Sequence, residues 1–147
     1  MKNSHKGPAC EDAYYTRALD ALGYRYDVWD TASWGPPDAS ILDLYRQGAV
    51  VWAAPADGYI NERFITTTRQ TVQSYLAGGG RLFISGQNIA EQLGNDVLLR
   101  DYLHAGYIQG NTGASSLTGV AGDPIGGGLT LNIAGGDGTN NQNSPDE

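Results

Sequence analysis

The side chains best able to form a hydrolytic centre are Ser85 and His104, with Asp96 or Asp101 to orient the imidazole. A serine nucleophile needs a base within hydrogen-bond reach, and the base needs an orienting carboxylate. The sharp turn that presents such a serine usually reads Gly-x-Ser-x-Gly, and neither glycine is present around Ser85. We therefore predict that Ser85 ends a strand and that His104 lies near a helix end. The catalytic pair remains the alternative.

A second set of candidates is acidic. Asp27, Asp30 and Asp57 fall at or near the carboxyl ends of predicted strands, the edge at which ligands bind in open α/β sheets. Carboxylate oxygens there are suitable ligands for Mg²⁺ or Ca²⁺. Asp is also common in turns and caps, because its side chain bonds the nearby backbone. The turn role is the preferred interpretation, so no metal site and no cofactor are predicted, and a divalent-cation site is the alternative.

Aromatic and amide side chains complete the candidate ligand edge. Trp34 precedes a Gly-Pro-Pro run and Tyr59 follows Asp-Gly, so the two rings could form a stacking platform for carbohydrate or peptide. Anchoring of the Pro-rich loop is the preferred role, since amphipathic rings combine an apolar body with a polar tip. Gln87 and Asn88 lie in the turn that follows the predicted strand at 81–85 and are placed at the same edge. The sheet edge is therefore the place where we expect a small-molecule, peptide or carbohydrate ligand to bind.

Helix and strand patterns that position these side chains alternate along the chain. Apolar spacing and capping residues predict helices over 11–22, from Asp38 or Ser40 to Tyr45, from a Thr67–Gln70 capping box to Ala77, over 89–93, and over 97–103. Alternating or continuous apolar runs predict strands at 24–29, 49–54 and 81–85. Residues 31–38, with adjacent prolines, are predicted to form a loop. Such alternation predicts an α/β fold, a three-layer, mostly parallel sheet with helices on both faces.

The C-terminal third has a different character. Short strand candidates at 107–109, 117–120 and 129–133 are separated by glycine-rich turns, which predicts a short β-rich C-terminal portion. Residues 1–10 are non-periodic and are interpreted as a disordered lead-in, and 134–147 as an irregular tail. The prediction is one α/β domain over 11–133.

Composition excludes several functions. The 147 residues include 16 Asp plus Glu against 9 Lys plus Arg, and the absence of a basic cluster argues against nucleic-acid binding. No apolar run approaches the roughly 20 residues that span a bilayer. No apolar segment follows Met1 in the manner of a signal peptide, so the chain as encoded is expected in the cytoplasm. Cys10 is the single cysteine, which excludes an internal disulfide or a Cys-based zinc site.

Three segments together carry a resemblance to a known family: residues 14–30, 79–87 and 117–126. The sequence resembles the class I glutamine amidotransferase-like, flavodoxin-like domains that accompany secreted bacterial peptidases and other extracellular multidomain proteins. The resemblance implies a flavodoxin-like sheet and an extracellular origin. A glutaminase of this class needs a cysteine nucleophile at the strand-to-helix turn, where residues 85–88 have none. The resemblance therefore implies the scaffold without the glutaminase activity.

Domains of this family begin with a further strand, for which residues 1–10 have no pattern. The first strand of a doubly wound sheet is usually central, so its loss uncovers strand edges and apolar helix faces. We therefore predict a non-catalytic binding or assembly module that associates with itself, as a dimer or by strand exchange. One alternative is a hydrolase or transferase that uses Ser85 and His104 or the acidic edge. Another is flavin or nucleotide binding at the sheet edge.

Overall fold

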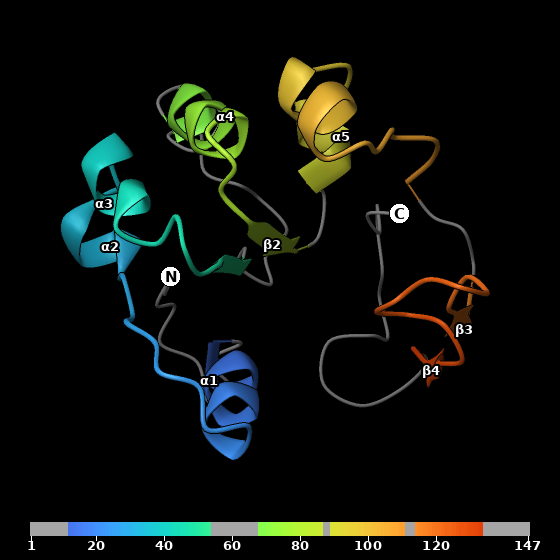
Figure 1. The fold of residues 1–147 in the computed structure, drawn as a ribbon. Helices are drawn as coiled ribbons and strands as arrows, with labels where there is room; N and C mark the ends of the chain where they lie inside the picture. Colours follow the sequence, from blue (N-terminus) through green and yellow to red (C-terminus); the bar gives the residue numbers. More distant parts are fainter. Residues whose placement is uncertain (1–11, 54–67, 87–88, 111–113, 134–147) are drawn as a thin grey trace.

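The computed structural model describes residues 12–53, 68–86, 89–110 and 114–133 (Figure 1). Its helices are α1 (Asp12–Ala21), α2 (Thr31–Trp34), α3 (Ala39–Asp43), α4 (Arg69–Ala77), α5 (Ile89–Leu93) and the π-helix η2 (Leu98–Tyr102). Its strands are β1 (Val50–Ala53), β2 (Leu82–Ser85), β3 (Ser116–Thr118) and β4 (Thr130–Asn132). The predicted lead-in over 1–10 and the tail over 134–147 lie outside the described residues.

A parallel strand–helix–strand unit forms the centre of the fold. Strand β1 pairs in parallel with β2, with Val50 opposite Leu82 and Ala53 opposite Ser85, and α4 lies between the two strands in sequence. Parallel strands need such a crossover connection, which the alternating pattern predicts. The mixed α/β character is thus confirmed. Among the described residues this sheet has two strands, so the three-layer flavodoxin-like sheet stays a prediction.

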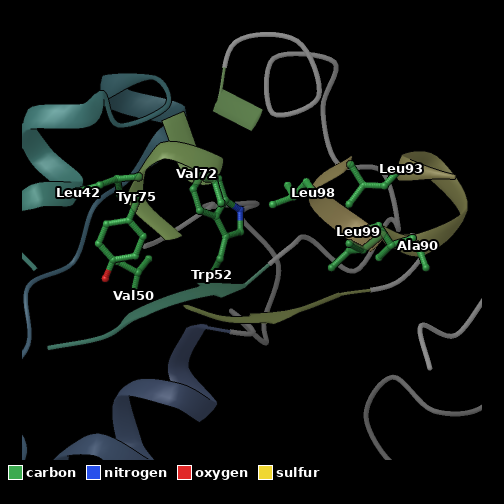
Figure 2. Packing of buried hydrophobic residues seen from close by; sticks show 10 residues of the cluster. Leu42, Val50, Trp52, Val72, Tyr75, Ala90, Leu93, Leu98 and Leu99 are labelled. Carbon is green, nitrogen blue, oxygen red and sulfur yellow. The ribbon is translucent and has the colours of Figure 1, made fainter. Parts of the chain in front are cut away.

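The hydrophobic core lies on one face of this sheet. Val50 and Trp52 alternate along β1 and are buried with Val72 and Tyr75 of α4. Figure 2 shows these side chains between the strands and the helices, with the buried residues of α5 and η2 beside them. Burial explains why β1 is a continuous apolar run, because its side chains on both faces of the sheet are at least partly covered. The predicted core position of Trp52 is confirmed.

The predicted strand at 24–29 is wrong, and so is part of the predicted loop at 31–38. Residues 24–29 have no strand structure, and the one-turn helix α2 begins at Thr31. Side-chain hydrogen bonds hold the segment instead: the Tyr26 hydroxyl donates to Asp20, and the Tyr45 hydroxyl donates to Asp27. The alternation of β-forming residues indicates a strand only where a neighbouring strand is available to pair with it.

Three further expectations are corrected at the level of single elements. The predicted helix over 97–103 is a π-helix, in which the Leu103 N–H donates to the Leu98 carbonyl five residues earlier at 2.9 Å. The residue before α4 is Thr68, without a side-chain cap bond, rather than Thr67 of the predicted capping box. The strand expected at 107–109 is not formed. Strands β3 and β4 do pair, antiparallel and with Leu117 opposite Leu131, as the β-rich C-terminal portion requires.

Candidate functional site

Ser85 is the last residue of β2, and His104 follows the C-terminal end of η2, as predicted. Among the described residues, no hydrogen bond joins the Ser85 side chain to His104. The Asp101 carboxylate binds the neighbouring Arg100 guanidinium through two hydrogen bonds, at 2.6 and 2.8 Å. These bonds lower the pKa of Asp101, with a smaller contribution from His104. The serine, imidazole and carboxylate therefore do not form a hydrogen-bonded triad here.

His104 determines the backbone conformation at the end of η2. Its φ of 53° is the one left-handed value outside glycine among the described residues. The neighbouring Leu103 and Ala105 N–H groups bond back to the carbonyls of Leu98 and Leu99. A left-handed residue after the last turn commonly ends a helix in this way, with glycine the usual choice. His104 therefore ends η2.

We expect His104→Gly to raise the free energy of unfolding by about 0.5–1 kcal/mol. The left-handed backbone conformation costs a non-glycine residue about 1–2 kcal/mol. Glycine removes this cost, but it loses more conformational entropy on folding, which offsets part of the gain in stability. Urea denaturation followed by circular dichroism measures the change. The matched control is Gly94→Ala, which creates the opposite change at φ 55° in open space and is expected to destabilise. A His104→Gly variant that is less stable would contradict the helix-ending role.

The acidic candidates have local structural partners. Asp27 accepts the Tyr45 hydroxyl at 2.8 Å, and this hydrogen bond, together with burial, raises the pKa of Tyr45. Asp30 accepts the Ser33 hydroxyl at 2.7 Å at the start of α2, which is the turn role preferred from sequence. Within the described residues, no three His, Cys, Asp or Glu side chains are grouped to hold a metal ion. Asp57 lies outside those residues.

Two tryptophans form the aromatic part of the candidate site. Trp34 is 62% exposed and meets Trp29 edge to face, with ring centroids 5.2 Å apart. The Trp29 indole N–H donates to the Gly35 carbonyl at 2.9 Å, where glycine permits a φ of 74°. Trp29 thus anchors the Gly-Pro-Pro loop, whereas the predicted anchoring role of Trp34 stays a prediction. Tyr59, the predicted partner of Trp34, lies outside the described residues, as do Gln87 and Asn88.

The same substitution at the two tryptophans separates these roles. Trp29→Phe is expected to lower the free energy of unfolding by about 1–2 kcal/mol, since it removes the bond to Gly35 and part of the ring packing. Trp34→Phe is expected to change stability by less than about 0.5 kcal/mol, as at other exposed positions. Thermal and urea unfolding of both variants measures the difference. Equal losses would mean that Trp34 also anchors the loop.

The described elements define a mixed α/β protein built on a parallel strand–helix–strand unit. No family model, no curated protein and no solved structure matches the chain. No helix in the described residues is both long enough and apolar enough to cross a membrane.

Proposed function

We propose that this chain is a non-catalytic binding or assembly module on an amidotransferase-like, flavodoxin-like scaffold, and that it associates with itself. The observation that carries the proposal is the exposure of side chains that strand alternation would bury. Tyr24, Tyr26 and Val28 occupy one face of the predicted strand and are 64%, 37% and 40% exposed. These exposed side chains lie close together in the chain, and contiguous exposed apolar surface is typical of interaction sites.

The order of strands in flavodoxin-like sheets supports the same proposal. That order is 2-1-3-4-5, so strand 2 pairs only with strand 1. In the proposed fold β1 and β2 correspond to strands 3 and 4, which are neighbours, and residues 24–29 correspond to strand 2. Among the described residues no strand corresponds to strand 1, so residues 24–29 have no ladder to join there, which agrees with their lack of strand structure. We propose that a second copy of the chain covers apolar surface that one copy leaves exposed.

The catalytic alternatives have separate tests. A hydrolase that uses Ser85 and His104 requires loss of ester hydrolysis in Ser85→Ala, and background rates in both proteins would exclude it. A divalent-cation site at the acidic edge requires a thermal shift with Mg²⁺ or Ca²⁺. Flavin binding requires a yellow purified protein. We expect none of these signals from the proposed binding module.

Light scattering after gel filtration tests self-association directly. The chain has a mass of 15.6 kDa, and we expect the dimer mass, twice this value, at micromolar concentration. A mass of one chain throughout a dilution series would contradict the proposal.

A further inference from the structure

The hydrogen-bond pattern of the parallel pair decides which backbone groups of β2 face away from β1. The Val50 N–H donates to the Arg81 carbonyl at 2.8 Å, and Val50 lies opposite Leu82. Residues of a strand alternate between bonding one neighbour and facing the other edge. The odd-numbered residues of β2 therefore direct their N–H and C=O groups toward β1. Leu82 and Ile84 direct theirs outward.

This outward edge has no partner strand in the part of the chain that the structure describes. The strand reads Leu-Phe-Ile-Ser, without the charges or proline that natural edge strands use to prevent pairing. Leu82 and Ile84 pack against the core, so Phe83 points to the opposite face. There it is 50% exposed, in edge contact with Tyr15 of α1. An unguarded edge with an exposed ring is a template for another strand.

The geometry points to a two-fold symmetric dimer in which β2 pairs antiparallel with β2 of a second copy, centred on Phe83. A strand edge is its own complement under a two-fold axis, because antiparallel strands exchange identical groups. With the axis at Phe83, Leu82 of one copy lies opposite Ile84 of the other, and both exchange their outward N–H and C=O groups. Every outward group of β2 is then bonded in one register, and the exposed Phe83 ring at the axis meets its own copy, which favours a second copy over an unrelated strand.

This register also brings the two Phe83 rings together. Phe83 and its copy form a non-hydrogen-bonded pair, whose Cα atoms lie about 4.5 Å apart with side chains in contact on one face. Aromatic pairs are among the favourable cross-strand contacts. The joined sheet has the order β1-β2-β2-β1, with α4 of both copies on the same face. The inference rests on the proposed self-association and places it at the outer edge of β2. In the 2-1-3-4-5 order this is the position of strand 5, which no strand takes among the described residues.

A charge at the two-fold axis tests the interface. In Phe83→Lys, two ammonium groups lie opposite each other and the aromatic pair is lost, so the dimer dissociation constant is expected to rise about tenfold or more. Analytical ultracentrifugation over a concentration series measures it, and circular dichroism verifies folding. The matched control is Ile108→Lys, at a position 81% exposed and outside the edge, which is expected to leave association unchanged.

A cysteine at the same position tests the register. In a Cys10→Ser background, Phe83→Cys places one cysteine of each copy at the two-fold axis. Their Cα atoms would lie about 4.5 Å apart, within the range of roughly 4.4–6.8 Å that disulfides require. We expect a covalent dimer under mild oxidation that reductant separates, and no comparable product from Ile108→Cys. A dimeric wild type that neither responds to Phe83→Lys nor cross-links through Phe83→Cys would overturn this interface and leave self-association standing. A wild type that is monomeric throughout would overturn both.

Discussion

Replacement of Asp96 by alanine is expected to lower the free energy of unfolding by about 2–3 kcal/mol. One carboxylate oxygen pairs with Arg69 of α4, in an ion pair whose side chains are 29% and 18% exposed. The other accepts the Leu98 N–H at 2.8 Å at the start of η2. Removal of the Asp96 carboxylate leaves the largely buried Arg69 guanidinium without its counter-charge. In a fully buried ion pair, the loss of one partner costs about 3–5 kcal/mol. Loss of a cap adds about 1 kcal/mol, and partial exposure reduces the total.

Urea denaturation monitored by circular dichroism measures the effect of Asp96→Ala. Asp101→Ala is the matched control, because its ion pair with Arg100 is 62% and 48% exposed, and exposed pairs contribute little to stability. Asp96→Asn keeps an acceptor for the Leu98 N–H but loses the charge, so we expect an intermediate loss. Equal effects of Asp96→Ala and Asp101→Ala would contradict the structural role of Asp96.

Leu42→Ala is expected to destabilise the protein by about 3 kcal/mol, whereas Leu44→Ala is expected to cost less than about 0.5 kcal/mol. The two leucines are close in sequence, but Leu42 is 1% exposed and Leu44 is 75% exposed. Figure 2 shows Leu42 beside Tyr75, at the contact between α3 and α4. Loss of a buried leucine side chain costs both its transfer free energy and the cavity it leaves.

Chemical denaturation of both leucine variants in parallel checks this prediction, because the substitution is identical and only burial differs. A shift in the denaturation midpoint of Leu44→Ala as large as that of Leu42→Ala would mean that α3 packs differently from the structure. An unchanged slope of the transition is expected in both, since neither variant alters the surface exposed on unfolding by much.

The sequence predicts the elements whose pattern is local and misses those that depend on a neighbour. Helix α1 and strand β1 follow from apolar spacing and a buried apolar run. Residues 24–29 have an equally clear alternation, but a strand also needs hydrogen-bond partners from elsewhere in the chain. The π-helix η2 was missed for a different reason: leucines four apart fit an α-helix, and the single wider turn leaves no mark in the spacing.

The candidate site is predictable in outline only. Ser85 ends its strand and His104 ends its helix, as expected from the turn residues around them. The anchoring role of Trp29 could not be predicted, because the sequence places it in a strand and the structure bonds its indole to Gly35. Asp96 was considered as a carboxylate that could orient His104. Its pairing with Arg69 joins residues far apart in sequence, and charge pattern alone does not specify such contacts.

The close fit of Tyr75 over Gly80 has a consequence for how the protein folds. A Cβ at Gly80 would lie 2.4 Å from the Tyr75 ring, and the Tyr75 hydroxyl accepts the Arg81 N–H at 3.2 Å. These contacts close a loop of only a few residues, which costs little chain entropy, whereas pairing of β1 with β2 must first close a much longer loop. Contacts of short range form fastest. We therefore expect the corner between α4 and β2 to form before β1 pairs with β2.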